Sequence, residues 1–248
     1  MEYRGYDSSG IAVNDGTIDV VKKAGKLANL EEILDPVALP GNTAIGHTRW
    51  ATHGRPTDAN AHPHVSFDGR VAIVHNGIIE NFAPLRQELL DAGVTLHSDT
   101  DSEVAAHLLA RAYNEGETAG DFRASALAVL GRLEGAFTLL FTHADHPDQI
   151  IAARRSTPLI VGVGEGEMFL GSDVAAFIEY TRNAVELDQD NVVVITRDGY
   201  EVLNFDGSPA EGRPFTIDWD LAAAEKGGFD SFMMKEIHEQ PAAVRDTL

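Results

Sequence analysis

The chain has 248 residues, of which 44% are hydrophobic and 23% charged, and these proportions exclude a disordered protein. Asp and Glu outnumber Lys and Arg by 39 to 19, and the net charge of −20 disfavours binding to nucleic acid or to an anionic membrane surface. The absence of cysteine excludes disulfides, thiolate metal sites and a cysteine nucleophile within these residues.

Short apolar runs alternate with segments of helical periodicity along the chain. The dipeptides Asp15-Gly16 and Asp198-Gly199 predict hairpin turns between neighbouring strands. No apolar run reaches the roughly 20 residues that cross a bilayer, and we expect a cytoplasmic protein. The predicted strands are residues 11–13, 18–21, 43–48, 71–75, 136–142, 149–153, 159–164, 168–171, 192–196 and 201–205.

Helices are predicted in clusters rather than in strict alternation with the strands. In the second of them, Thr100 and Glu103 have the spacing of a capping box. Clustered helices beside many strands predict an α+β fold with antiparallel pairing. From about Glu211 the composition changes, which indicates the exit from the domain. The predicted helices are residues 84–92, 102–114, 122–133 and 173–180.

Polar motifs follow two of the predicted strands. In "GHTRWATHG", Arg49 offers a fork of donors suited to a carboxylate, and Trp50 could cap a pocket. By itself this motif is more typical of a surface arginine beside a core tryptophan. In "VHNGIIEN", Asn76-Gly77 ordinarily predicts a hairpin turn, but no second alternating strand follows. Its alternative use is as two adjacent N–H donors, which suit an oxyanion hole.

The motif "SDTDSEV" places Asp101 at the start of a predicted helix. Complementation of the helix dipole is the simpler interpretation, and binding of a substrate ammonium is the functional one. With Arg49 for a carboxylate and Asn76-Gly77 for an oxyanion, the set describes a site for an α-amino acid whose side-chain carbonyl is attacked. The set contains no nucleophile.

Several histidines are close together in the sequence: His47, His53, His62, His64 and His75. A zinc site is one interpretation, because imidazole is a common zinc ligand. However, no His-x-x-x-His pair falls on a predicted helix, and an extended His62-Pro63-His64 would point its two rings to opposite faces. We therefore expect structural or hydrogen-bonding histidines, with neither a metal nor another cofactor.

Six motifs together resemble one family: "EYRGYDSSG", "GHTRWATHG", "NAHPHV", "VHNGIIENF", "SDTDSEV" and "KEIHEQP". The family is the glutaminase domain, a type 2 glutamine amidotransferase, of glutamine–fructose-6-phosphate aminotransferase (isomerizing), and the resemblance covers essentially the whole chain. It implies an α+β fold arranged as a four-layer αββα sandwich of the N-terminal-nucleophile hydrolase type. It also implies hydrolysis of glutamine to glutamate and ammonia, which an isomerase domain uses to make glucosamine 6-phosphate from fructose 6-phosphate.

The same resemblance implies roles for the site residues. Asn76 and Gly77 would form the oxyanion hole. Arg49 would hold the α-carboxylate of glutamine, and Asp101 would hold its α-ammonium. In the family, the thiol of an N-terminal cysteine attacks the amide, and its own α-amino group acts as the base. The other matching positions are Thr52 and His53 in a loop that closes over glutamine, Trp50 as a gate for ammonia, and Arg4, His62 and His75 near the site.

The chain departs from the family at both ends. Family members begin with Met-Cys-Gly-Ile, a strand and a helix, whereas here "EYRGYD" follows Met1 directly. We expect a glutaminase domain at residues 1–216 that lacks its first strand and helix, and a linker at 217–248 toward an absent isomerase domain. The predicted partners are glutamine and that isomerase domain, with a homodimer expected only for the full-length enzyme. The chain alone is predicted to be inactive.

Two alternatives remain open at this point. The first is a non-catalytic glutamine-binding or interaction module, which glutamine binding without hydrolysis would favour. An upstream reading frame that encodes Met-Cys-Gly-Ile would instead indicate a truncated gene product. The second is a histidine-rich metallohydrolase, which purified protein without bound metal would exclude.

Overall fold

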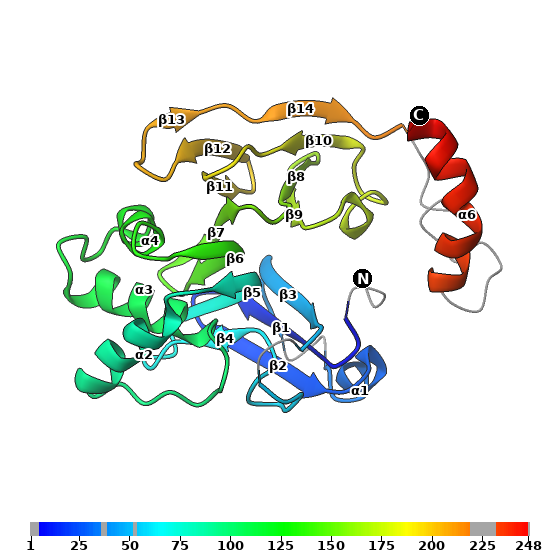
Figure 1. Cartoon of the computed structure of the whole chain (residues 1–248). Helices are drawn as coiled ribbons and strands as arrows, with labels where there is room; N and C mark the ends of the chain where they lie inside the picture. Colours follow the sequence, from blue (N-terminus) through cyan, green and yellow to red (C-terminus); the bar gives the residue numbers. More distant parts are fainter. Residues whose placement is uncertain (1–4, 36–38, 52–53, 219–231, 248) are drawn as a thin grey trace.

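The computed structural model describes residues 5–35, 39–51, 54–218 and 232–247. Its strands form three sheets, and every strand pair in these ranges is antiparallel (Figure 1). The helices gather beside the sheets instead of alternating with the strands. The predicted α+β class with antiparallel pairing is therefore confirmed.

The largest sheet, called the central sheet, has seven strands in the order β13-β12-β11-β7-β6-β5-β4. In chain order these are β4 (His64–Val65), β5 (Val71–Ile79), β6 (Gly135–His143), β7 (His146–Arg155), β11 (Asn191–Thr196), β12 (Gly199–Asn204) and β13 (Pro209–Ala210). The N-terminal sheet has the order β2-β1-β3 and contains β1 (Ser8–Asn14), β2 (Ile18–Ala24) and β3 (Thr43–Arg49). The C-terminal sheet has the order β14-β10-β8-β9 and contains β8 (Ile160–Val163), β9 (Met168–Gly171), β10 (Asn183–Glu186) and β14 (Arg213–Thr216).

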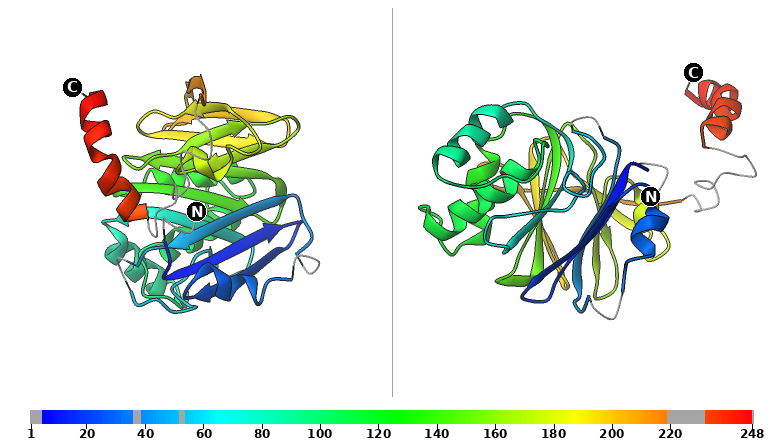
Figure 2. Two further views of the ribbon diagram at one scale, coloured as in Figure 1. Left: turned by 90° about the vertical axis from the view of Figure 1, so that its right-hand side faces the viewer. Right: turned by 90° about the horizontal axis from the view of Figure 1, so that it is seen from below.

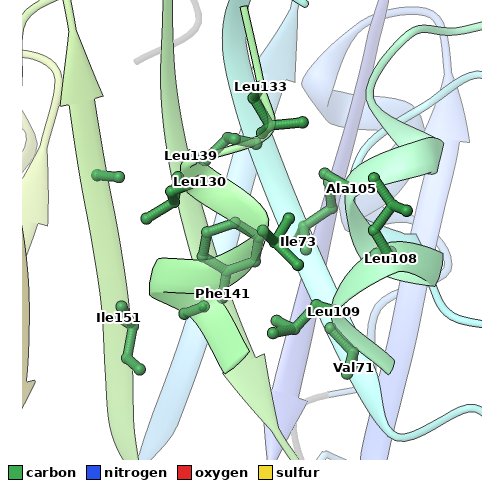
Figure 3. Close-up of a cluster of buried hydrophobic side chains, with 14 of the residues drawn as sticks. Val71, Ile73, Ala105, Leu108, Leu109, Leu130, Leu133, Leu139, Phe141 and Ile151 are labelled. Carbon is green, nitrogen blue, oxygen red and sulfur yellow. The ribbon is translucent and has the colours of Figure 1, made fainter. Parts of the chain in front are cut away.

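Three helices cover one face of the central sheet: α2 (Phe82–Asp91), α3 (Glu103–Glu115) and α4 (Phe122–Leu130). Figure 3 shows Phe141 and Ile73 of the sheet packed against Leu109 of α3. Burying a Leu or Phe side chain of this kind stabilises the fold by about 1.5–3 kcal/mol, far more than the intrinsic helix preference of any residue. This packing therefore holds the helices in place.

The opposite face of the central sheet is covered by the two smaller sheets. Successive strand residues point to opposite faces, so Ile73 of β5 faces the helices while Ala72 and Val74 face the other way. Ile45 of β3 and Val161 of β8 belong to the same buried cluster as Ala72. In Figure 2 the helices, the central sheet and the smaller sheets form successive layers.

The remaining helical elements lie outside this sandwich. The short helix α1 (Leu27–Glu31) contacts β2, and the 3₁₀ turn η3 (Val174–Ala176) follows β9. Helix α6 (Phe232–Thr247) stands apart from the sheets in Figures 1 and 2. None of the described helices is long and apolar enough to cross a bilayer. The four-layer αββα arrangement stays a prediction.

Most predicted elements are present within a few residues of their expected bounds. Both predicted hairpins are confirmed, because β1 pairs with β2 across Asp15-Gly16 and β11 pairs with β12 across Arg197-Asp198. The change of composition at Glu211 does not mark the exit from the sheets, since β14 still pairs with β10 beyond it. The strands that were not predicted are β4, β10, β13 and β14.

Two local predictions are wrong. Residues 173–180 form only a 3₁₀ turn, because the Asp173 side chain accepts the Ala175 N–H and Phe177 then leaves the helical conformation. The capping box is also absent, since the Glu103 carboxylate does not bind back to Thr100. It accepts the N–H groups of His97 and Ser98 at 2.8 and 2.7 Å.

Candidate functional site

A cavity of about 780 Å³ opens where β3, β5 and the start of α3 come together. Its walls include apolar residues from both smaller sheets, such as Ile11 and Leu170. The predicted site residues that line this one cavity are Arg49, Trp50, His62, His75, Asn76, Gly77 and Asp101. The fold therefore brings together groups that are up to 52 residues apart in the sequence (101 minus 49).

Arg49 is the last residue of β3 and is 6% exposed. The residue just before β1 holds its backbone, since the Asp7 N–H donates to the Arg49 carbonyl at 3.1 Å and the Asp7 carboxylate accepts the Ala51 N–H at 2.7 Å. Gly5 lies so close that a Cβ there would approach the Arg49 carbonyl carbon to 2.6 Å. Gly5 and Asp7 therefore pack directly against the backbone of Arg49.

Asn76-Gly77 lies inside β5 and does not form a hairpin turn. Asn76 is opposite Thr138 and Gly77 is opposite Phe137 of β6, and both residues of the pair are exposed toward the cavity. Gly77 has φ +115°, and a Cβ at this position would lie 2.0 Å from the Ala136 carbonyl oxygen. Glycine is therefore required here by conformation and by space.

Asp101 connects the end of β5 to the start of α3. Its Oδ2 accepts the Ile79 N–H at 2.8 Å, and its Oδ1 accepts the Ser102 hydroxyl at 3.3 Å. It is 6% exposed and precedes the N-cap residue, Ser102, of α3. Burial lowers the pKa of Arg49, while the carboxylates of Asp7 and Asp101 oppose that shift.

Four histidine rings gather beneath the cavity. The His62 ring stacks on His47 with centroids 4.4 Å apart, and it meets the edge of His64 at 4.7 Å. The expectation that His62 and His64 point to opposite faces is wrong, because His62 lies in a bend and the strand begins only at His64. Among the described residues, no group of three or more His, Asp or Glu side chains is arranged to hold a metal ion.

Burial keeps these rings neutral near neutral pH. It lowers the pKa of each ring, to about 3 for His64 and to about 4 for His75. The rings are held by hydrogen bonds instead of ion pairs: His62 Nδ1 accepts the His75 N–H at 3.1 Å, and His75 Nδ1 lies 2.8 Å from the Ser102 hydroxyl.

His47 also lines the cavity, although the motifs predict only a structural or hydrogen-bonding histidine at this position. Its Nε2 lies 2.8 Å from Oδ1 of Asn76. A signal was available in the sequence, because residues two apart on a strand share a face and His47 stands two positions before Arg49 on β3.

The remaining predicted residues lie at the margin of the cavity or outside the described residues. Trp50 is 60% exposed, and its ring centroid is 5.4 Å from that of Tyr6. Arg4, Thr52 and His53 lie outside the part of the chain that the structure describes.

Comparison with known families identifies the fold around this cavity. A sequence profile described as "Glutamine amidotransferase domain" matches residues 36–205, a range that contains Arg49, Asn76, Gly77 and Asp101. The chain belongs to the glutamine amidotransferase domain family.

Curated relatives of this amidotransferase domain are similar over the full length of the chain. A glutamine–fructose-6-phosphate aminotransferase (isomerizing) from Mycolicibacterium paratuberculosis is 65% identical over 257 aligned residues, covering 100% of the chain and 41% of the relative. The enzyme of that name from Corynebacterium glutamicum is 62% identical over 250 aligned residues, which cover 100% of the chain and 40% of that relative. The chain thus spans about two fifths of the length of these relatives.

Solved structures share the fold. Glutamine phosphoribosylpyrophosphate amidotransferase from B. subtilis, complexed with ADP and GMP, matches with a TM-score of 0.68 and 25% identity, over 82% of this chain and 44% of the other. A glutamine aminotransferase class-II domain protein from Silicibacter pomeroyi matches with a TM-score of 0.53 and 16% identity. The match covers 80% of this chain and 91% of the other. The second likeness concerns the fold alone.

Proposed function

We propose that the chain is the glutamine-binding part of a glutamine–fructose-6-phosphate aminotransferase. The observation that carries this proposal is a single cavity lined by a cation, Arg49, an anion, Asp101, and the N–H donors of Asn76-Gly77. A free α-amino acid requires a cation for its carboxylate and an anion for its ammonium group. An amide that is to be attacked requires donors at its carbonyl oxygen.

The two charged residues hold the α-groups of glutamine in this proposal. The Arg49 guanidinium forms a bidentate pair with the α-carboxylate. Asp101 accepts hydrogen bonds from the α-ammonium. Its oxygens already accept from Ile79 and Ser102, but an ionised carboxylate has about four acceptor sites, so capacity remains.

Asn76 and Gly77 act on the other end of the substrate. The Asn76 Nδ2 group and the Gly77 backbone N–H stabilise the negative charge that develops on the side-chain oxygen when the amide is attacked. Trp50, which lines the cavity and is largely exposed, gates the passage of ammonia.

In the complete enzyme the reaction releases ammonia from glutamine. A thiolate attacks the amide carbon, the C–N bond breaks as ammonia leaves, and water hydrolyses the resulting thioester to glutamate. The 248 residues contain no cysteine, so we propose that this chain binds glutamine without hydrolysing it. Residues 1–216 form the amidotransferase part, and residues 217–248 connect it to the part that uses the ammonia.

Calorimetry with glutamine and an ammonia assay on the 248-residue chain test the two halves of this proposal. We expect saturable glutamine binding, with ammonia release no higher than in a blank. A lack of binding at millimolar glutamine would contradict the assigned site. Ammonia release well above the blank would contradict the assigned lack of hydrolysis.

A further inference from the structure

We propose that His47 is a positioning residue, which donates its Nε2–H to Oδ1 of Asn76 and thereby turns the Asn76 Nδ2 group toward the reacting carbonyl of the substrate. The inference rests on the proposed function, because it concerns how the oxyanion donor is oriented. It adds to that function a residue that acts through Asn76.

The hydrogen bond fixes the direction in which the amide points. His47 Nε2 and Asn76 Oδ1 are 2.8 Å apart, and a carbonyl oxygen can only accept, so the imidazole must be the donor. The amide is planar, with nitrogen and oxygen on opposite sides of the carbon. Among the described residues, Asn76 Nδ2 has no hydrogen-bond partner, and Asn76 is exposed toward the cavity.

Orientation matters because an asparagine amide is nearly symmetric in shape. Rotation by half a turn exchanges the NH₂ group for the carbonyl oxygen at almost no steric cost. In the rotated state an oxygen would face the negative charge that develops on the substrate, and the stabilisation would become repulsion. In the Nε2–H tautomer His47 Nε2 donates and cannot accept, so this tautomer disfavours the rotated amide.

His47 itself is held firmly. Its ring stacks on His62 at an interplanar angle of 25°, and the backbone N–H of His75 donates to His62. Gly10, opposite His47 in the N-terminal sheet, allows this approach, since a Cβ there would lie 2.3 Å from the His62 carbonyl oxygen. Burial lowers the pKa of His47, so the ring carries one proton near neutral pH. Among the described residues the buried Nδ1 of His47 has no hydrogen-bond partner, so a proton on Nδ1 would be left unsatisfied, whereas a proton on Nε2 has Asn76 Oδ1 as its acceptor.

The test compares two ligands on three forms of the 248-residue chain. Glutamine has the side-chain carbonyl, whereas norvaline has the same α-groups and no carbonyl. In His47→Gln the Nε2 amide can replace the imidazole N–H, whereas His47→Leu removes the donor. We expect His47→Leu to weaken glutamine binding about fivefold to tenfold, the effect of one lost hydrogen bond, with norvaline binding unchanged. His47→Gln should retain most of the glutamine affinity.

An equal loss for both ligands in His47→Leu would overturn the proposal, because it would indicate damage to the whole pocket. If the ratio of the glutamine affinity to the norvaline affinity is the same in His47→Leu as in the unmodified chain, the proposal is overturned as well. Denaturation curves of each form establish that the variants are folded.

A ligand-free measurement separates this inference from the proposed function. In ¹⁵N-detected NMR of the unmodified chain we expect His47 in the neutral Nε2–H form, with Asn76 Nδ2 resonances that move in His47→Leu and are restored in His47→Gln. A neutral Nδ1–H form would refute the hydrogen bond directly. If the unmodified chain binds neither ligand, the proposed function fails, and the NMR result alone then decides the His47–Asn76 geometry.

Discussion

Neutral donors supply the hydrogen bonds to the buried carboxylate of the cavity, although Arg49 lines the same cavity. Asp101 is buried, yet its partners are the Ile79 N–H and the Ser102 hydroxyl, and these neutral donors stabilise the ionised carboxylate without neutralising it. A buried carboxylate of this kind can still attract a cation that enters the cavity. The residue thus combines a structural and a binding role, and substitution can separate them.

Asp101→Asn is expected to separate the two roles. The amide oxygen can still accept the Ile79 N–H, so the free energy of unfolding should change by less than about 1 kcal/mol. The α-ammonium of glutamine loses its counter-charge, and we expect the glutamine dissociation constant to rise at least about tenfold. Calorimetry measures this change, with Asp91→Asn at the exposed end of α2 as the control. Equal glutamine affinity in Asp101→Asn and the unmodified chain would refute the assigned role.

At the scale of elements, β5 is a strand whose second half lines the cavity. Its first half is buried on both faces, whereas Asn76, Gly77 and Ile78 are exposed. The strand continues to pair with β6 through this half, which holds the donors rigidly at the cavity wall. Gly77 makes this continuation possible, because no side chain fits between it and Ala136.

Gly77→Ala is therefore expected to destabilise the fold strongly. The added Cβ meets backbone at 2.0 Å and the φ of +115° is strained for alanine, so we expect a loss of about 2–5 kcal/mol in the free energy of unfolding. Gly69→Ala is the matched control, since Gly69 also has positive φ (+72°) but has nothing within 4 Å of an added Cβ, and its cost should be about 1 kcal/mol. Urea denaturation compares the two, and equal losses would contradict the steric argument.

Sequence patterns predict the elements that have a regular apolar repeat and miss those that do not. Strands such as β6 and β11 are rich in β-branched and aromatic residues and were predicted. β14 was missed because it contains Pro214 and is exposed along its length, as edge strands often are. The Asn76-Gly77 dipeptide resembles a turn locally, and only its pairing with β6 keeps it in a strand.

For the site, the sequence motifs predicted the residues but not their hydrogen bonds. Arg49, Asn76 and Asp101 do line one cavity, as the motifs suggested. The spacing on β3 places His47 on the same face as Arg49, but its hydrogen bond to Asn76 depends on the distance between β3 and β5, which the spacing does not give. The Glu103 side chain binds the backbone before the helix because of how that loop folds, and the capping-box spacing could not reveal this.

At the scale of the whole molecule, the buried histidines connect the site to stability. In the unfolded chain these rings take up a proton when the pH falls below their ordinary pKa of 6.5. In the folded chain their pKa is lower, for example about 4 for His75, so they take up a proton only at a lower pH. The unfolded state therefore binds more protons between these values, and the folded state loses stability as pH falls through this window. The loss is about 1.4 kcal/mol per pH unit for each such histidine.

We expect the free energy of unfolding to fall steeply between about pH 6.5 and pH 4, measured by urea denaturation at several pH values. In His64→Gln, which replaces a ring with a pKa of about 3, the slope should decrease by about 1.4 kcal/mol per pH unit. His97→Asn changes an exposed histidine and serves as the control. Glu103, with a pKa of about 2, contributes only below its ordinary value of 4.5, so it does not obscure the higher window. A flat pH profile above pH 4.5 would exclude this mechanism.

The exposed indole of Trp50 has an optical consequence. Indole emission moves to shorter wavelength when water is removed from the ring, and Trp50 lies on the wall of the cavity with most of its surface in solvent. The chain has two tryptophans, and replacing Trp219 with phenylalanine would leave Trp50 as the sole emitter. The protein thus carries its own fluorophore at the entrance of the cavity, and occupancy of the site can be followed in real time without a label.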